Sequence, residues 1–350
     1  MKAVFSAAQL RHAPTRFLSL GKIVDYPEQP ERVRRLLEGA RQAGATIHAT
    51  RRFDPATFDD VHLPAYLAFL RGAFEDWEKI EGAGPELMPS IRPMARPFAR
   101  SPHILARAGM FLMDFSCPIT AKTWTSASVS AMTALTAAEL VASGEKASYA
   151  LCRPPGHHAY ANRASGFCYL NNGAFAAERL RNHHARVVIL DIDVHHGNGT
   201  QSVFYDRADV LTVSIHADPA EFYPFYWGTA EETGDDEGED YNLNLPLPVG
   251  AGDDQWLKAL DIALERIRKF APGAMVLALG LDAHEADPLQ GGKVTTAGFA
   301  RIAEKIAGLS LPTVIVQEGG YLTDHLADNL ATFLTSYEGA LELTVDAAAE

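Results

Sequence analysis

Short apolar runs alternate with amphipathic stretches along most of this chain, and this alternation limits the folds that it can adopt. The amphipathic stretches, at 123–142, 256–270 and 296–307, show the spacing of helices with one buried face. Strands that alternate with helices favour an α/β fold with a parallel sheet covered by helices. The predicted strands span residues 148–152, 187–192, 210–215, 275–281 and 313–316.

The length and composition fit one large α/β domain. The chain has 350 residues and 47% hydrophobic content, which is enough to bury a sizeable core. No apolar run approaches the about 18–20 residues of a membrane span, and the N-terminus resembles an opening strand rather than a signal peptide. The three cysteines are odd in number and form no CxxC pair, which suits free thiols in a reducing compartment. We therefore expect a cytoplasmic protein with no membrane partner.

The charge balance bears on possible partners. The formal net charge is −13, whereas phosphate binding needs clustered lysine and arginine. We therefore expect no nucleic-acid partner. A negative field of this kind favours cationic ligands.

Polar residues follow each predicted strand. In a parallel α/β sheet, ligands bind at the carboxyl ends of the strands. Any one of these residues could instead cap a helix or form a turn, but several together favour a ligand site. The residues that follow the strands in this way are His157, His158, Asp193, His195, His216, Asp282 and Tyr321.

Three of these residues have the chemistry of a metal site. Asp193 and His195 are two positions apart, so their side chains point the same way if the strand continues. Asp282, from another strand end, would add a third ligand. Three protein ligands with an open position are typical of catalytic zinc. Asp191 shares the same face and is placed to orient a neighbour.

Two further features suit hydrolysis. His157 and His158 follow the stiff, turning segment Pro-Pro-Gly, which could present both rings to a cavity. Histidine can remove a proton and return it near neutral pH. Tyr321 could donate its phenol hydrogen to a developing oxyanion. By contrast, His183 and His184 lie at the polar end of a predicted helix, where we expect no catalytic role.

Five motifs in this order resemble the zinc-dependent histone deacetylase and acetylpolyamine amidohydrolase family. They lie between residues 153 and 321, and the N-terminal segments HAP and YPEQPER extend the resemblance over nearly the whole chain. The insertion at 80–118 and the segment WGTAEETG resemble the bacterial acetylpolyamine amidohydrolase branch. The five motifs read RPPGHHA, GFCYLNNGAFAAERL, LDIDVHHGNGTQSVFY, LALGLDAHEADP and QEGGY.

The resemblance implies an arginase/deacetylase fold, with a parallel sheet of about eight strands between helices. It implies a single catalytic domain over residues 1–350, with an inserted loop region at about 80–118. The implied reaction removes acetyl groups from small N-acetylated amines, either acetylpolyamines or acetyl-lysine-like compounds, by attack of a zinc-bound water. A homodimer is also implied, in which the insertion packs at the mouth of the channel.

The resemblance also assigns the catalytic and metal-binding residues. One zinc ion, or iron in the cell, would bind Asp193, His195 and Asp282. His157 would pair with Asp191, while His158 would act as general base and acid. Tyr321 would polarise the acetyl carbonyl. The partner behind His158 is an aspartate in many family members, but here Asn198 occupies that position.

The remaining assignments concern the channel and a second ion. Gly166 would accept the substrate amide hydrogen through its carbonyl, and Phe167 and Tyr223 would wall the channel. Tyr223 stands where phenylalanine is common and adds a hydroxyl to an apolar wall. A potassium ion would lie near Asp191, Asp193, His195 and Ser214, and a second cation site near Phe204 and Val210.

Three alternative functions remain at this stage. A protein or peptide acetyl-lysine deacetylase would use the same metal site. A two-manganese ureohydrolase would need a further carboxylate, but Gly197 and Ala283-His284 occupy the relevant positions. A non-catalytic acyl-amine binding module would be expected to lack the histidine base or Tyr321, and both are present.

The sequence leaves the acylated amine open. Residues 102–107, where a carboxylate would be expected to bind a second ammonium group, contain none. The acidic residues that could replace it are Asp25, Glu28, Glu31 and Glu86.

Overall fold

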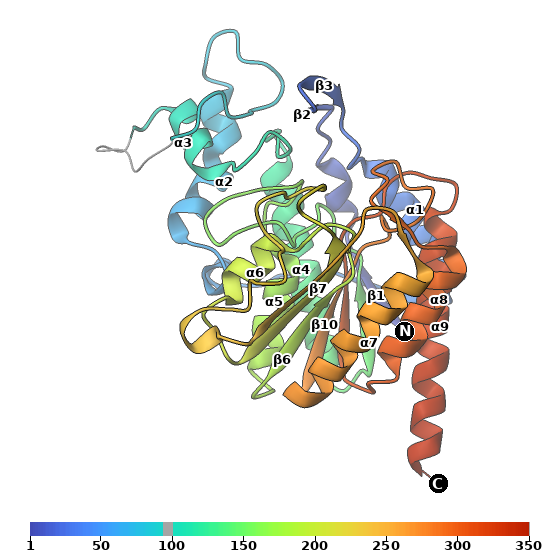
Figure 1. The fold of residues 1–350 in the computed structure, drawn as a ribbon. Helices are drawn as coiled ribbons and strands as arrows, with labels where there is room; N and C mark the ends of the chain where they lie inside the picture. Colours follow the sequence, from blue (N-terminus) through green and yellow to red (C-terminus); the bar gives the residue numbers. More distant parts are fainter. Residues whose placement is uncertain (94–100, 350) are drawn as a thin grey trace.

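An eight-stranded parallel sheet forms the centre of the structure, a computed structural model that describes residues 1–93 and 101–349 (Figure 1). All seven strand pairings in this sheet are parallel, which confirms the predicted fold class. The strands, in spatial order, are β4 (Thr46–Ala49), β1 (Lys2–Phe5), β5 (Ala147–Ala150), β12 (Thr313–Gln317), β10 (Ala274–Leu279), β6 (Val187–Asp191), β7 (Val210–Ala217) and β8 (Asn242–Leu247).

Helices cover both faces of the sheet because its strands are apolar on both sides. In β10, Met275 and Leu277 belong to one hydrophobic core, while Val276 between them belongs to the other, as the two-residue period of a strand requires. The first core includes residues of α1 (Pro30–Gln42), α7 (Asp253–Phe270), α8 (Thr296–Ala307) and α9 (Leu326–Ala349). The second includes residues of α2 (Pro64–Trp77), α3 (Ile104–Phe111), α4 (Thr123–Ala142), α5 (Asn172–Arg181) and α6 (Asn198–Phe204).

The predicted elements agree with the structure over most of their length. Helices α4 and α8 have the predicted bounds, and the Thr295 side chain caps α8 by accepting from the Gly298 N–H. The prediction of a loop over 80–118 was wrong for Ile104–Phe111, which form α3. That helix is capped by His103, whose side chain accepts from the Leu105 N–H. Residues 94–100 of the same segment lie outside the described residues.

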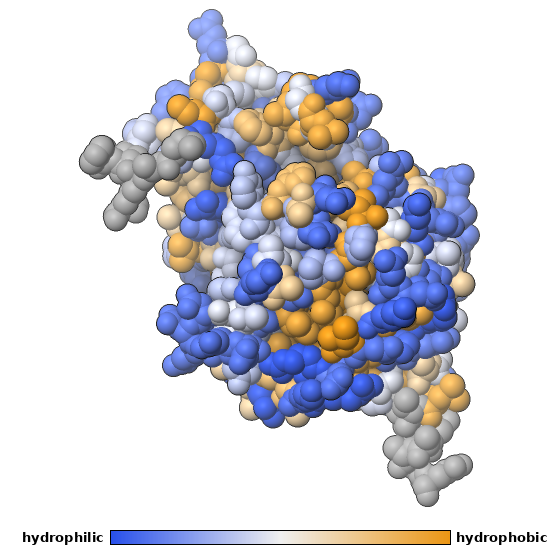
Figure 2. All heavy atoms as spheres, viewed as in Figure 1, coloured by the Kyte–Doolittle hydropathy of each residue, from blue (hydrophilic) through white to orange (hydrophobic). Residues whose placement is uncertain are grey.

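The elements beyond the carboxyl ends of the strands surround the polar residues of interest. Helices α2 and α3 and the hairpin of β2 (Arg16–Ser19) and β3 (Lys22–Asp25) lie at this end of the sheet (Figure 1). The hairpin exposes Leu18, Leu20 and Ile23, and Figure 2 shows apolar side chains gathered at its position. Among the described helices, none combines the length and the apolar character needed to cross a membrane.

Candidate active site

Asp193, His195 and Asp282 lie together, as the sequence predicts. Strands β6 and β10 are paired neighbours, so the residues that follow them meet at one edge of the sheet. All three side chains are buried, and their ligand atoms lie within 4.8 Å of one another. His195 Nδ1 is 3.0 Å from Asp193 Oδ1 and 3.2 Å from Asp282 Oδ2.

Backbone N–H groups orient both carboxylates of this cluster. Gly319 N–H donates to Asp193 Oδ2 at 2.7 Å, and Val194 N–H donates to Asp282 Oδ1 at 3.1 Å. A Cβ atom at Gly319 would lie 2.0 Å from Asp282 Oδ2, so a side chain there would displace the Asp282 carboxylate. The close approach of these backbone segments therefore requires glycine.

The cluster has the chemistry of a cation site. Burial, and then the neighbouring Asp193 carboxylate, raise the pKa of Asp282. Among the described residues, the His195 ring at 3.2 Å is the one donor group near Asp282 Oδ2. Two buried carboxylates side by side are costly unless a positive ion lies nearby. The residues present therefore fit a divalent metal ion.

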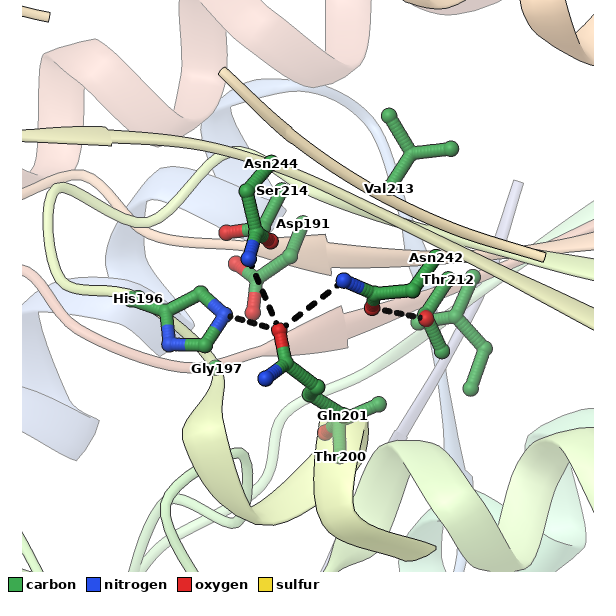
Figure 3. Close-up of a pocket in the computed structure, with 11 residues that line it drawn as sticks. Asp191, His196, Gly197, Thr200, Gln201, Thr212, Val213, Ser214, Asn242 and Asn244 are labelled. Carbon is green, nitrogen blue, oxygen red and sulfur yellow. Dashed lines mark hydrogen bonds between the residues drawn. The ribbon is translucent and has the colours of Figure 1, made fainter. Parts of the chain in front are cut away.

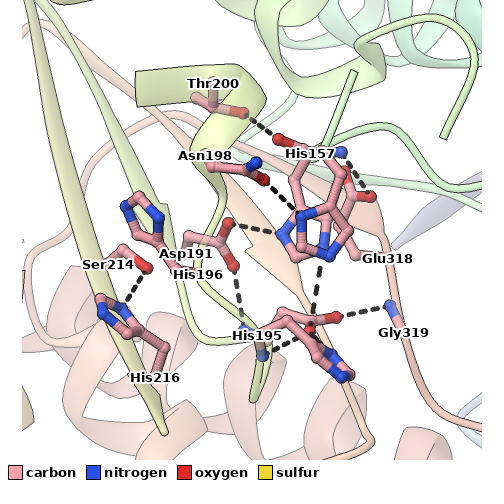
Figure 4. Close-up of polar contacts among 12 residues, drawn as sticks. His157, Asp191, His195, His196, Asn198, Thr200, Ser214, His216, Glu318 and Gly319 are labelled. Atoms are coloured by element: carbon pink, nitrogen blue, oxygen red, sulfur yellow. Dashed lines mark hydrogen bonds and ion pairs between the residues drawn. The ribbon is translucent and has the colours of Figure 1, made fainter. Parts of the chain in front are cut away.

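His157 pairs with Asp191. Its Nδ1–H donates to Asp191 Oδ2 at 2.9 Å, which leaves Nε2 on the side of Asp193 (Figure 4). Burial disfavours a charge on the ring, but the Asp191 and Asp193 carboxylates outweigh burial and raise the pKa of His157 to about 10.

His158 pairs with Asn198, the first residue of α6. His158 Nδ1 is 2.6 Å from Asn198 Oδ1, and Asn198 Nδ2 donates to the Tyr160 hydroxyl. The Asn198 oxygen can only accept, so Nδ1 carries the proton and Nε2 is free to accept one. Burial, and then His157 and His195, lower the pKa of His158 well below its usual value. The two adjacent histidines therefore favour opposite protonation states.

Glu318 holds the turn that presents both histidines, and sequence reasoning missed it. Its Oε2 accepts the backbone N–H groups of Gly156 at 2.6 Å and His157 at 3.1 Å. Figure 4 shows this carboxylate on the opposite side of His157 from Asp191. The signal was present in QEGGY, but only the tyrosine of that motif was given a role.

Tyr321 lies at the site, and hydrogen bonds hold the backbone on which it stands. The Tyr321 N–H donates to Asp287 Oδ2 at 2.9 Å. The Arg32 guanidinium lies 4.8 Å from the Tyr321 ring centroid. The same guanidinium donates to the carbonyls of Gly320 at 2.5 Å and Glu318 at 2.7 Å. Arg32 therefore fixes the backbone that leads to Tyr321.

Glu28 cannot bind a second ammonium group at the channel mouth. It is fully buried and accepts from Arg32 and Arg153, each at 2.7 Å. Glu86 is also buried and accepts from the N–H and hydroxyl of Thr15. The other two candidates are paired with arginines, the exposed Asp25 with Arg16 and the partly exposed Glu31 with Arg34.

The predicted channel residues adjoin Tyr321 and His158. Phe167 packs edge-on against Tyr321, with ring centroids 5.9 Å apart. Tyr223 meets His158 edge-on at 5.1 Å. A Cβ atom at Gly166 would lie 2.2 Å from His158 Cδ2, so this glycine packs directly on the His158 ring.

A small polar cavity of about 10 Å³ lies beside Asp191 and Ser214 (Figure 3). Its volume is close to that of one water molecule or small ion. The Ser214 hydroxyl and His216 Nδ1 are 2.8 Å apart, and His216 Nε2 is 2.8 Å from the Gly228 carbonyl. Because that carbonyl can only accept, His216 Nε2 carries the proton and Ser214 donates to Nδ1. The oxygen lone pairs of Ser214 are then free for a cation.

Not every predicted residue joins this cavity. The side chains of Asp193 and His195 belong to the group that they form with Asp282, and they are not part of the cavity lining. His196 lines it and bonds to Gln201, whose amide oxygen also accepts from Asn242 and Asn244 (Figure 3). His183 and His184 follow the end of α5 and precede β6, at the opposite end of that strand from the site.

Comparison with known proteins identifies the class to which this architecture belongs. A model of the histone deacetylase domain matches residues 26–337. The chain is similar to an acetylpolyamine amidohydrolase of Burkholderia pseudomallei, with 45% identity over 97% of this chain and 99% of that protein. It is 37% identical to the acetylpolyamine amidohydrolase of Mycoplana ramosa, over 97% of this chain and all of that protein.

Solved structures agree with the sequence comparisons. The crystal structure of an acetylpolyamine aminohydrolase from Burkholderia pseudomallei superposes with a TM-score of 0.95 at 45% identity, over 97% of this chain and 99% of that chain. The HDA15 HD domain superposes with a TM-score of 0.78 at 26% identity, over 98% of this chain and 91% of that chain.

Proposed function

The chain belongs to the histone deacetylase family, and on that premise we propose that it hydrolyses the acetyl amide of small N-acetylated amines, first of all acetylpolyamines. The observation that carries this choice is the near-complete overlap with proteins named acetylpolyamine amidohydrolases. By contrast, the histone deacetylase-like amidohydrolase of Pseudomonas aeruginosa aligns over only 62% of this chain and 59% of its own length.

We infer that Asp193, His195 and Asp282 hold one zinc ion. Two carboxylates and one imidazole with an open position form a ligand set that suits catalytic zinc. When bound, the ion supplies Lewis-acid polarisation of the acetyl carbonyl and makes water acidic enough to act as a nucleophile near neutral pH. Support comes from the convergence of these three buried side chains and the raised pKa of Asp282.

In this proposal His158 is the general base and acid. Its Nδ1 proton is committed to Asn198, so Nε2 accepts the proton of the attacking water and later returns it to the leaving amine. His157 donates its Nδ1 proton to Asp191, whose negative charge favours the protonated ring and so a positive charge beside the reacting groups. The different environments of the two rings support this division.

Tyr321 stabilises the developing oxyanion in the same proposal. Burial raises the pKa of Tyr321, so its hydroxyl remains a donor at neutral pH. Arg32 and Asp287 hold the residue in place from the side of the ring and from the backbone. A donor that is fixed in advance loses no orientation energy as the oxyanion forms.

We further propose one potassium ion in the cavity beside Asp191 and Ser214, and a homodimer that narrows access to the site. The orientation of the Ser214 hydroxyl toward His216 supports the first proposal. An apolar groove of about 690 Å³ supports the second, since its lining includes the exposed Ile91 and Met110, and grouped apolar side chains at a surface often mark an interface. Three unpaired buried cysteines suit the cytoplasmic location that we propose.

Metal analysis tests the proposed centre. We expect one zinc or iron ion per purified chain, and loss of activity on chelation that is restored by adding the metal back. Asp282→Asn should sharply lower metal occupancy because it removes a charged ligand. Asp254→Asn, at an exposed position on α7, makes the same change away from the site and should leave occupancy unchanged. Two ions per chain, or full activity after exhaustive chelation, would contradict the assignment.

A further inference from the structure

Asp114 joins the segment at 80–118 to the residues around the candidate channel, although sequence reasoning gave it no role. Its Oδ2 accepts hydrogen bonds from the Tyr223 hydroxyl at 2.6 Å and the Gly166 N–H at 3.1 Å. The Ser165 hydroxyl is a third donor at 3.2 Å. The other oxygen, Oδ1, accepts the N–H and hydroxyl of Ser116, at 2.9 and 2.5 Å. Five donors therefore converge on one partly exposed carboxylate.

The first consequence concerns Tyr223. Its hydroxyl proton is committed to Asp114, and its oxygen lies 2.8 Å from the Ser165 hydroxyl oxygen. Burial, and then the charge of Asp114, raise the pKa of Tyr223, so the phenol stays protonated. The added hydroxyl therefore leaves the channel wall apolar, and it fixes the Tyr223 ring against His158.

The second consequence concerns the turn that carries Gly166 and Phe167. Ser165 and Cys168 exchange backbone hydrogen bonds of 3.1 and 2.8 Å, which closes a tight turn. Both central residues have left-handed backbone angles, with φ of 53° at Gly166 and 69° at Phe167. A phenylalanine in this region is strained and persists only where its surroundings hold it. Asp114 supplies such a restraint through the Gly166 N–H.

We propose that Asp114 is a positioning residue that fixes the shape of the channel from behind its wall. By holding the Tyr223 ring and the Gly166–Phe167 turn at once, it keeps a narrow passage that suits an unbranched aminoalkyl chain. It also makes the passage depend on the segment at 80–118, in which Asp114 lies. This inference rests on the proposed hydrolysis of small acetylated amines and names the residue that selects their shape.

The direct test is a kinetic comparison of Asp114→Asn, Tyr223→Phe and the double variant, all loaded with metal. The amide introduced by Asp114→Asn would keep one acceptor but turn an N–H₂ group toward the remaining donors. We expect Asp114→Asn to raise KM for monoacetylated diamines about tenfold while kcat changes by less than about threefold. The double variant should be no worse than Asp114→Asn alone, because both changes break one network.

Ser116→Ala is the matched control, because it removes a hydroxyl donor from Oδ1 and leaves the Oδ2 network intact. It should leave KM unchanged. Metal content and melting temperature of each variant exclude a general loss of structure. If Asp114→Asn does not fold, Tyr223→Phe, which keeps the carboxylate, must still raise KM relative to Ser116→Ala.

Binding separates this inference from the proposed function. The affinity of metal-loaded protein for a straight-chain alkyl hydroxamate and for its branched isomer can be measured without turnover. Asp114→Asn, or Tyr223→Phe in its place, should reduce the preference for the straight chain. Wild-type protein that hydrolyses no acetylated amine would overturn the proposed function alone. Unchanged KM and unchanged hydroxamate preference, or additive effects in the double variant, would overturn the role of Asp114.

Discussion

At the scale of single residues, the convergence of the candidate catalytic side chains could be anticipated from the sequence, but the residues that support them could not. His157, His158 and Tyr321 follow strand ends, and such positions converge in a parallel sheet. Glu318 and Asp114 act by accepting backbone N–H groups from distant turns, at Gly156 and Gly166. A contact between a carboxylate and the backbone leaves no pattern in the sequence, because any residue except proline supplies the N–H.

Tyr321 should be required for turnover. Tyr321→Phe removes only the hydroxyl and keeps the ring that Arg32 covers. We expect kcat to fall by roughly a hundredfold or more, as for the loss of one oxyanion donor, with folding and metal content intact. Tyr337→Phe, also buried but in α9, should retain activity. Near wild-type kcat in Tyr321→Phe would rule out the oxyanion role.

The residue behind His158 should set the acid limb of the pH–rate profile. Asn198→Asp places a carboxylate beside His158 Nδ1, where it stabilises the imidazolium and raises the pKa of His158. Because the base must be neutral, the limb of kcat/KM against pH should move to higher pH. Asn182→Asp, at an exposed position, adds the same charge away from the site. Equal profiles for the two variants would show that residue 198 does not tune His158.

At the scale of elements, periodicity predicted the interior of the fold better than its edges. Helices α4 and α8 carry clear amphipathic or apolar patterns, and their bounds were correct. The edge strands β4 and β8 were missed. Strand β8, with sequence NLNLPL, mixes asparagine and proline with leucine because an edge strand needs to pair on one side only. The short helix α3 was not predicted, because eight residues show too little of the helical periodicity.

His62 should make stability depend on pH through its link to α5. Its Nδ1–H donates to the Tyr160 carbonyl, and its Nε2 accepts from the N–H of Asn171, the residue that caps α5. Burial lowers the pKa of His62 to about 4, so the folded state binds a proton less readily than the unfolded state, with its pKa of about 6.5. This contribution to stability is present above pH 6.5 and is lost as pH falls toward 4.

Between pH 7 and 5, this linkage should remove about 2 kcal/mol from the free energy of unfolding. His62→Gln can keep one donor and one acceptor but cannot titrate, so it should lose correspondingly less over this range. Denaturant unfolding at both pH values measures the difference. His183→Gln, at an exposed position, serves as the control. A pH dependence in His62→Gln equal to that of the wild type would contradict the prediction.

At the scale of the whole molecule, the net charge and the segment at 80–118 should both affect which substrates reach the site. The net charge of −13 should favour cationic amines, with an effect that weakens as salt rises. Sequence could not place the acidic residues, and burial of Glu28 and Glu86 removes two candidates for the channel mouth. The single-domain organisation and the homodimer stay predictions. A monomer in solution with a wide, open site would contradict the narrow access that we propose.

The most direct test of the central claim is kcat/KM of the metal-loaded protein across one panel of substrates. The panel contains a monoacetylated diamine, an N-acetylalkylamine without the second ammonium group, an acetyl-lysine peptide and an intact acetylated histone. We predict the highest value for a small acetylated amine, with the cationic diamine above its neutral counterpart at low salt, and the lowest value for the histone. Faster hydrolysis of the histone than of every small amide would contradict the account.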